Sequence, residues 1–239
     1  MHYQPRLDAR SGRIESAEAL TRWQRPGHGL VPPNDFIELA EISGLIAALG
    51  ETVLDQALAQ MARWLASGLP MKRVSVNVSP RQFESGALPD QVRAALLRHA
   101  VDPRCLELEV TESVLSGDVT QVTRQLAGLR ALGVTVAMDD FGTGYSSMAL
   151  LRSLPIDVMK IDRTFVRDLE TDPNAVAIAR AIVALGRSLS LRLVAEGIET
   201  PGQAGLLREM ACDEFQGYLF GKPMPAPEFE ALFAAAARA

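Results

Sequence analysis

The sequence predicts an α/β fold, a TIM-like (β/α)8 barrel. Short apolar runs with strand character alternate with amphipathic helical patterns, and the short connections between them favour parallel pairing. Closing such a sheet brings the strand ends to one rim. Polar side chains stand at the ends of successive runs: Glu18, Asn77, Glu109, Asp139 with Asp140, Lys160 and Glu196. We therefore expect these side chains to meet at the mouth of a barrel.

The chain has 239 residues, of which 48% are hydrophobic and 22% are charged. This size matches a typical barrel of about 250 residues. A second domain would leave too few residues for either. We expect residues 1–239 to form a single domain.

The first elements follow from local signals. A strand is expected at His2–Pro5, so close to the start that we expect the chain to be cut from a longer one. A turn at Asp8–Gly12 leads to a strand over Ile14–Trp23. Two prolines introduce a helix that ends near Ile42, and a long amphipathic helix follows over Leu45–Ala66.

The remaining chain repeats a strand and helix unit. The expected strands are Val74–Val78, Leu106–Val110, Val134–Met138, Val158–Ile161, Leu193–Ala195 and Phe215–Gly217. The expected helices are Leu88–His99, Val119–Leu132, Ala175–Ser188, Pro201–Met210 and Ala226–Ala237. Gly133 is a good helix-stop residue after the second of these.

Charge and hydropathy exclude several classes of function. A net charge of -5 argues against binding to a nucleic-acid polymer, because counterion release needs a surplus of Lys and Arg. The chain contains no apolar run of about 20 residues, and its start is too polar for a signal peptide. We expect a cytoplasmic domain without membrane contact. A small anionic ligand stays compatible with this charge if metal ions supply local positive charge.

The metal-ligand residue types narrow the kind of site. Cys105 and Cys212 form no CxxC pair, and His2, His28 and His99 show no ligand spacing. A site made of carboxylate and amide oxygens selects hard cations such as Mg²⁺ or Mn²⁺ over Zn²⁺.

The segment from Asp139 to Ser147 is the most specific one. Two adjacent carboxylates end an apolar strand and open a glycine-rich loop. Adjacent strand residues point to opposite faces, so Asp139 and Asp140 address one site only if the strand ends or bulges there. A solvated Asp-Asp turn is the plain alternative.

Isolated carboxylates in apolar strands are costly. Glu18, Glu109 and Glu196 would each cost several kcal/mol unless paired or metal-bound. Glu107 shares a strand face with Glu109 and is compatible with a core ion pair. Lys160 has two readings, a structural counterion to these acids or a group that positions a nucleophilic water.

A series of motifs in fixed order then resembles a known family. The segments are Gln4-Pro5, Glu18-Ala19-Leu20, Arg22-Trp23, Asn77-Val78-Ser79, Glu109-Val110-Thr111-Glu112, Asp139 to Ser147, Lys160-Ile161-Asp162, Ala195 to Glu199 and Gln216 to Phe220. In this order they resemble the EAL-domain cyclic di-GMP phosphodiesterases over nearly the whole chain. Thr21, where leucine is commoner, and Met148 are small departures.

The resemblance implies a modified barrel whose first strand is antiparallel, and it implies roles for individual residues. The implied metal ligands are Glu18, Asn77, Glu109, Asp139, Asp140 and Glu196, with Asp139 bridging two ions. The implied catalytic residues are Lys160, which contacts the attacking water, Glu196, Glu112, which holds the loop after Asp140, and Glu199. The implied substrate contacts are Gln4, Leu20, Arg22, Asp162 and Gln216.

The family also implies cofactors and partners. Two Mg²⁺ or Mn²⁺ ions would serve each site, and Ca²⁺ is expected to inhibit. The substrate would be cyclic di-GMP, opened to linear pGpG. A homodimer and upstream sensory or GGDEF-type domains are also expected.

Three rival readings remain in view. A receptor that binds cyclic di-GMP without cutting it would be expected after loss of metal ligands, and every ligand position is intact here. An enolase-type barrel also places carboxylates and a lysine at strand ends, but the glycine-rich Asp-Asp loop argues against it. A kinase reading of Asp140-Phe141-Gly142 fails because no His-Arg-Asp loop precedes it.

Overall fold

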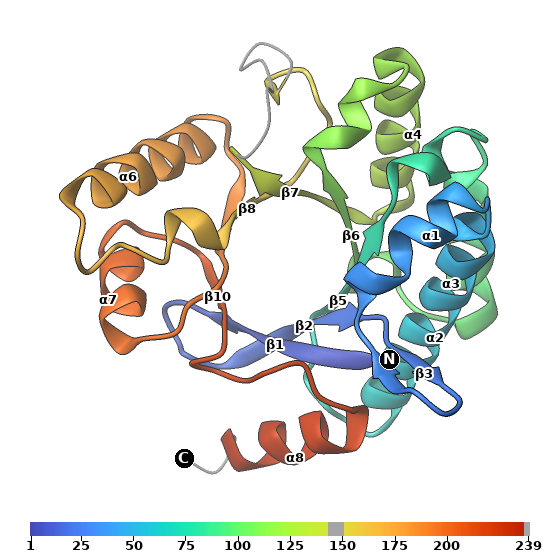
Figure 1. The fold of residues 1–239 in the computed structure, drawn as a ribbon, viewed down its shortest axis with the longest axis horizontal. Coiled ribbons are helices and arrows are strands. Elements are labelled where there is room, and N and C mark those ends of the chain that lie inside the picture. The colour runs from blue at the N-terminus through green and yellow to red at the C-terminus, as the bar shows by residue number, and fades with distance from the viewer. Residues whose placement is uncertain (143–150, 237–239) are drawn as a thin grey trace.

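The computed structural model describes residues 1–142 and 151–236. Its main sheet is a closed barrel with the strand order β1-β10-β9-β8-β7-β6-β5-β2 (Figure 1). The strands are β1 (His2–Asp8), β2 (Ile14–Leu20), β5 (Arg73–Val78), β6 (Leu106–Thr111), β7 (Thr135–Phe141), β8 (Val158–Ile161), β9 (Arg192–Ala195) and β10 (Glu214–Gln216). The expected TIM-like barrel is confirmed.

The first strand runs against the others. β1 pairs antiparallel with both β2 and β10, whereas β2 pairs parallel with β5. The link between β1 and β2 is a tight turn in which the Asp8 carboxylate accepts hydrogen bonds from the backbone N–H groups of Arg10 and Ser11. A parallel pair needs a crossover of a dozen or more residues, so this short link forces a hairpin.

Helices surround the barrel (Figure 1). They are α1 (Ile37–Ile42), α2 (Ile46–Ala66), α3 (Leu88–His99), α4 (Val119–Leu132), α6 (Pro173–Ser188), α7 (Pro201–Glu209) and α8 (Ala226–Ala236). Asp118 caps the start of α4, and Gly133 ends it at a left-handed φ of 98°. None of the described helices combines the length and apolar character that crossing a membrane requires.

Strand alternation sorts side chains into an outer core and a barrel interior. On β1, Tyr3 points outward and packs edge-on against Trp64 of α2 and Phe229 of α8. The main apolar core therefore lies between strands and helices. Ala137, Val158 and Val194 form a separate small buried cluster. Many of the strand residues that alternate with this outer core point into the barrel interior, and polar residues such as Gln4 are among them.

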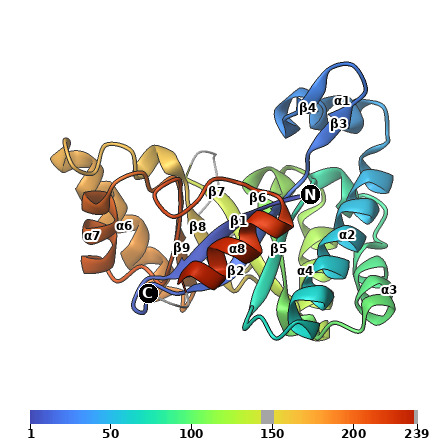
Figure 2. The ribbon, with the colours of Figure 1, turned by 90° about the horizontal axis from the view of Figure 1, so that it is seen from below.

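One expected strand is two. β2 ends at Leu20, and a separate hairpin follows, made of β3 (Trp23–Arg25) and β4 (Gly29–Val31). The expectation of one strand over Ile14–Trp23 was wrong, because β2 leaves the barrel sheet after Leu20 and Trp23 pairs instead with Val31, in a hairpin that turns at the Pro26-Gly27 pair. The hairpin and α1 project beyond the barrel (Figure 2).

Candidate active site

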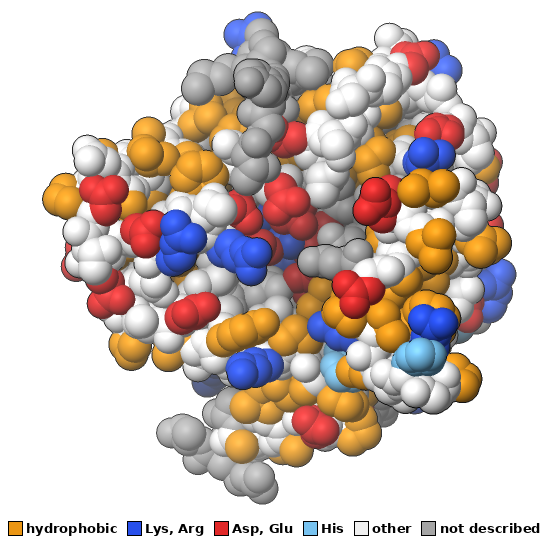
Figure 3. All heavy atoms as spheres, in the orientation of Figure 1, with side chains coloured by type: hydrophobic (Ala, Val, Ile, Leu, Met, Phe, Trp, Pro, Cys, Tyr) orange, Lys and Arg blue, Asp and Glu red, His pale blue; other side chains and the backbone are white. Residues whose placement is uncertain are grey.

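The predicted site residues converge on one buried ammonium group. Lys160, on β8, is 1% exposed. Its Nζ lies 2.5 Å from Glu109 Oε2, 2.6 Å from Glu196 Oε1 and 3.2 Å from Asp139 Oδ1. Glu18 Oε2 lies 3.9 Å away. Figure 3 shows acidic and basic side chains gathered at the centre of this face.

Each carboxylate reaches the mouth because of its place on a strand. Glu109 lies near the end of β6, Glu18 lies on β2, Asp139 lies on β7, and Glu196 directly follows β9. The backbone N–H of Glu196 donates to the carbonyl of Ile161, which continues the pairing of β8 with β9. The barrel thus brings together acids that lie up to 178 positions apart, from Glu18 to Glu196.

A bulge places the paired aspartates. The pairing of β7 with β8 shifts register between Met138 and Phe141, and Asp140 has a left-handed φ of 53°. The backbone N–H of Asp140 donates to Asp139 Oδ1 over 2.9 Å. The bulge meets one of the two conditions that the sequence analysis set for a shared site, and it breaks the alternation that would otherwise send the two carboxylates to opposite faces.

Amide side chains hold Glu18 in place. Asn77 Nδ2 donates to Glu18 Oε1 over 2.7 Å, and Gln216 Nε2 donates to Glu18 Oε2 over 2.6 Å. Gln216 Nε2 also lies 3.2 Å from Gln4 Oε1. The amides of β1, β5 and β10 therefore orient one carboxylate of the cluster.

Several carboxylates at the mouth surround the single ammonium group of Lys160, and this excess of acids shifts their pKa values. Burial raises the pKa of Glu109 well above its usual range, and the Glu18 charge adds to this. Burial likewise raises the pKa of Glu196 to about 8 despite the nearby Lys160. Burial alone would lower the pKa of Lys160, but Asp139 and the other acids hold it well above its usual value. The cluster therefore has too little positive charge to balance its carboxylates.

Asp140 and Glu18 respond differently to the same cluster. Burial, Asp139 and Asp162 raise the pKa of Asp140. Burial also opposes ionisation of Glu18, but the Lys160 charge and the Gln216 and Asn77 hydrogen bonds lower its pKa overall. Glu18 therefore has a lowered pKa, whereas the pKa values of Glu109, Asp140 and Glu196 are raised.

Glu112 contacts the start of the glycine-rich loop. It opens the 3-10 helix after β6, and its Oε1 accepts a hydrogen bond from the backbone N–H of Gly142 over 3.0 Å. This contact is the one expected from the sequence. The rest of that loop, residues 143–147, lies outside the described residues, as does Met148.

Of the remaining predicted residues, Arg22 lies near Glu18 and Asp162 lies near Asp140, so that their charges act on these acids. Leu20 ends β2, and Arg22, which is partly buried, donates to the carbonyl of Thr21. Asp162 follows β8 and accepts from the Thr164 N–H. Glu199 is exposed, and within the described part of the chain its carboxylate has no contact with Lys160.

Glu107 lies deeper than the acidic cluster. Its Oε1 lies 2.5 Å from Nη1 of Arg6, and its Oε2 lies 3.5 Å from Nε of Arg73. The interpretation of Glu107 as a core ion-pair partner is confirmed. Sequence reasoning missed Arg6, since a lone arginine in a short first strand gives no local sign of burial.

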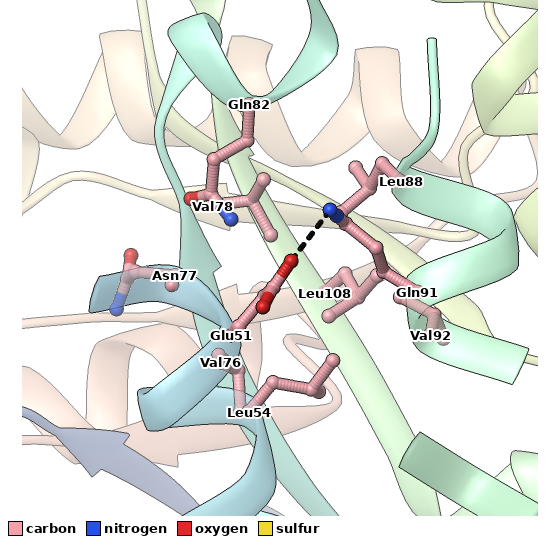
Figure 4. Close-up of a pocket in the computed structure, with 11 residues that line it drawn as sticks. Glu51, Leu54, Val76, Asn77, Val78, Gln82, Leu88, Gln91, Val92 and Leu108 are labelled. Atoms are coloured by element: carbon pink, nitrogen blue, oxygen red, sulfur yellow. Dashed lines mark hydrogen bonds between the residues drawn. The ribbon is translucent and has the colours of Figure 1, made fainter. Parts of the chain in front are cut away.

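A small crevice lies beside Asn77 on its outer side (Figure 4). It lies between α2, β5 and α3, and most of its lining is apolar. Gln91 Nε2 donates to Glu51 Oε1 across it over 2.8 Å. Its lining includes none of the acids around Lys160, so the candidate active site is the barrel mouth.

The donor chemistry of the mouth fits divalent metal ions. Across residues 1–142 and 151–236, no three His, Cys, Asp or Glu side chains already form a metal cage, because the acids converge on Lys160 instead. Carboxylate and amide oxygens in surplus over positive charge are nevertheless the ligands that Mg²⁺ and Mn²⁺ prefer. A divalent cation would supply the charge that the raised pKa values of Glu109 and Glu196 show to be missing.

Comparison with known families decides where the chain belongs. The family model described as EAL domain matches residues 1–223. The chain belongs to the EAL domain family. This confirms the resemblance drawn from the motifs, and the pairing of β1 confirms the antiparallel first strand that the resemblance implied.

Individual relatives are close to this EAL domain. It is 48% identical over 228 residues to the bifunctional diguanylate cyclase/cyclic di-GMP phosphodiesterase MucR of Pseudomonas aeruginosa, covering 95% of this chain and 33% of MucR. It is 43% identical over 230 residues to the cyclic di-GMP phosphodiesterase NbdA of the same organism, covering 96% of this chain and 29% of NbdA. The EAL domain thus spans about a third of the length of these curated relatives.

Solved structures share the fold. The PaMucR phosphodiesterase in its c-di-GMP complex superposes with a TM-score of 0.90 at 48% identity, covering 95% of this chain and 92% of that one. The EAL enzyme Bd1971, bound to cAMP and cyclic di-GMP, gives a TM-score of 0.92 at 32% identity and covers 97% of this chain and 64% of that one.

Proposed function

We propose that this EAL domain is a metal-dependent phosphodiesterase that hydrolyses cyclic di-GMP to linear pGpG. The observation that carries the proposal is the convergence of Glu18, Glu109, Asp139 and Glu196 around Lys160. The relatives named as cyclic di-GMP phosphodiesterases support the substrate.

The residues at the mouth divide between two metal sites in this proposal. Glu18, Asn77, Glu109 and Asp139 would hold one ion, and Asp139, Asp140 and Glu196 would hold the other. When bound, Mg²⁺ or Mn²⁺ ions would supply positive charge that lowers the pKa of the attacking water and stabilises charge on the phosphoryl oxygens.

The reaction itself is a hydrolysis at phosphorus. The oxygen of water forms a bond to phosphorus, the bond to the sugar 3′ oxygen breaks, and that oxygen leaves with a proton. Lys160 and Glu196 orient the attacking water in this scheme, since both lie at the centre of the cluster. Glu112 contributes by holding Gly142 next to Asp140, and Glu199 supports the segment after β9.

Substrate contacts surround this centre. Arg22 is well suited to a phosphate, because a planar guanidinium can donate two hydrogen bonds at once. Gln4, Leu20, Asp162 and Gln216 complete the proposed contacts.

The proposal extends to the context of the domain. Residues 1–239 form one catalytic domain of a longer cytoplasmic protein, which acts as a homodimer. Upstream sensory or GGDEF-type domains regulate it. The share of MucR and NbdA that the chain covers supports the presence of further domains.

One experiment separates this function from that of a receptor. The protein is incubated with cyclic di-GMP and Mg²⁺, with and without EDTA, and the nucleotides are separated by chromatography. We expect pGpG to appear only in the samples without EDTA, where Mg²⁺ can bind to the protein. Binding of cyclic di-GMP without turnover at any tested metal concentration would favour the receptor and reject the enzyme.

A further inference from the structure

A second buried ion network lies beneath the acidic cluster. Arg6, on β1, is 1% exposed and occupies the same strand face as Gln4. Its Nη1 lies 2.5 Å from Glu107 Oε1, and its Nη2 lies 2.9 Å from Glu214 Oε2. The Ser75 hydroxyl accepts a further hydrogen bond from Nη1 over 3.3 Å. Arg6 is thus held firmly from below.

Glu109 joins this network to the proposed metal centre. Arg6 Nη1 donates to Glu109 Oε1 over 3.3 Å, while Lys160 Nζ donates to Glu109 Oε2 over 2.5 Å. The two oxygens of one carboxylate therefore have different partners. Arg6 holds Oε1 of Glu109, and Oε2 of the same carboxylate is directed at Lys160 in the centre of the mouth.

We propose that Arg6 is a positioning residue that orients Glu109 for metal binding. This inference rests on the proposed function, because it assigns Glu109 to the metal centre. Side chains that hold a ligating carboxylate from behind typically change metal affinity by about 10- to 100-fold when they are replaced.

The geometry of the guanidinium explains why arginine suits this position. One planar fork reaches Glu107 and Glu109 through Nη1 and Glu214 through Nη2. A lysine would keep the positive charge but has a single ammonium that cannot copy the fork. Arg6→Lys therefore tests orientation with the net charge unchanged.

The chain offers a matched control. Arg73 also lies in the network, where it contacts Glu107 at 3.5 Å and Glu214 at 2.5 Å. Among the described residues its ion pairs do not include Glu109. Arg73→Lys should disturb the same network without disturbing the ligand.

The experiment measures Mn²⁺ binding without substrate. Calorimetry and the electron paramagnetic resonance signal of free Mn²⁺ give the dissociation constant, and thermal melts in EDTA give the stability of the metal-free fold. We expect Arg6→Lys to weaken Mn²⁺ binding by about 10- to 100-fold and Arg73→Lys to leave it within about twofold of the wild type. Both variants should lower the melting temperature.

The outcomes distinguish the two levels of the argument. Wild-type Mn²⁺ affinity in Arg6→Lys, or equal losses in both variants, would overturn the positioning role alone. Absence of Mn²⁺ binding by the wild type would overturn the proposed metal centre and this role with it.

A milder pair keeps the test decisive if Arg6→Lys does not fold. Ser75→Ala removes one hydrogen bond to Arg6 Nη1, whereas Ser16→Ala removes one hydrogen bond to Glu214 Oε2 at the other end of the network. We expect about two- to tenfold weaker Mn²⁺ binding in Ser75→Ala only. Equal affinities in the two serine variants would overturn the positioning role.

Discussion

Glu18 shows how the surroundings of a single residue can be expected from the sequence and then described in the structure. A carboxylate in an apolar strand predicts a partner, and the structure supplies Asn77 and Gln216 as donors, with Lys160 beyond them. The sequence could not name these partners, because they come from strands that only barrel closure brings together.

The structure leads to a direct test of Glu18. Glu18→Gln keeps the side-chain size and one oxygen but removes the charge, so we expect turnover of cyclic di-GMP to fall by at least about 100-fold while the fold persists. The measurements are kcat with saturating Mg²⁺ and a thermal melt.

A control variant lies on the same strand. Glu15→Gln changes a carboxylate that pairs with the exposed Lys72, away from the mouth, and should retain normal turnover. A folded Glu18→Gln variant with wild-type kcat would mean that Glu18 is structural.

Proton uptake by the acidic cluster would make binding at the proposed metal centre depend on pH. The pKa of Glu196 is raised to about 8 from 4.5 in the metal-free fold. The folded state therefore holds a proton that the unfolded chain has lost between these two values, so this group's contribution to stability declines as pH rises through 8. A bound metal takes the place of that proton.

The expected result is stronger metal binding at higher pH. Mg²⁺ affinity should rise by about tenfold per pH unit for each proton that the metal displaces, and the share that comes from Glu196 should level off above pH 8. Calorimetry in buffers of different ionisation enthalpy checks the proton count. An affinity that is flat from pH 6 to 8 would contradict the raised pKa of Glu196.

At the scale of elements, the sequence predicted regular helices and strands well and irregular connections less well. The expected bounds of α3, α4 and β8 agree with the structure, because hydrophobic periodicity and end signals coincide there. The hairpin of β3 and β4 was missed because its strands are short and exposed, so they carry no alternating pattern.

The antiparallel direction of β1 could have been derived from the residues alone. A link of a few residues between two adjacent strands allows only a hairpin. Periodicity gives the position of a strand but not its direction. The direction of β1 follows instead from the short link to β2, and the family resemblance implies the same direction.

The contact between Glu112 and Gly142 predicts a role for the loop that follows Asp140. Glu112→Ala removes the acceptor of the Gly142 N–H. We expect kcat to fall by about tenfold or more with little change in KM, because Asp140 loses its support while the substrate contacts remain. A change in stability of at most about 1 kcal/mol is expected from one exposed hydrogen bond.

A conservative variant sharpens this test. Glu112→Gln retains a side-chain oxygen that can accept from Gly142, so it should restore most of the lost kcat. Normal kcat and metal dependence in Glu112→Ala would reject the loop-anchor role, and failure of Glu112→Gln to rescue would point to the charge instead.

At the scale of the whole molecule, barrel closure is what turns scattered acids into a site. Glu18, Glu109, Asp139 and Glu196 come from different strands, and the ring of hydrogen-bonded strands fixes their mutual spacing. The fold class was predictable from the alternation of strands and helices. The depth of each side chain inside the barrel was not predictable, because strand stagger decides that Glu109 contacts Lys160 while Glu107 contacts Arg6.

This fixed spacing leads to a prediction about metal choice. Mg²⁺ bonds oxygen at about 2.0 to 2.1 Å in near-octahedral geometry, whereas Ca²⁺ bonds at about 2.3 to 2.6 Å with more ligands. Strand-borne carboxylates cannot all move outward to suit the larger ion, so the water would sit too far from phosphorus. We expect turnover with Mg²⁺ or Mn²⁺, and at least about a 100-fold loss when Ca²⁺ replaces them, with binding of cyclic di-GMP retained.

The measurements are pGpG formation by chromatography and nucleotide affinity by calorimetry after EDTA treatment and dialysis against each metal. Addition of excess Mg²⁺ to the Ca²⁺-loaded protein should restore turnover, which excludes irreversible damage. Comparable rates in Ca²⁺ and Mg²⁺ would show that the barrel does not impose the spacing argued here.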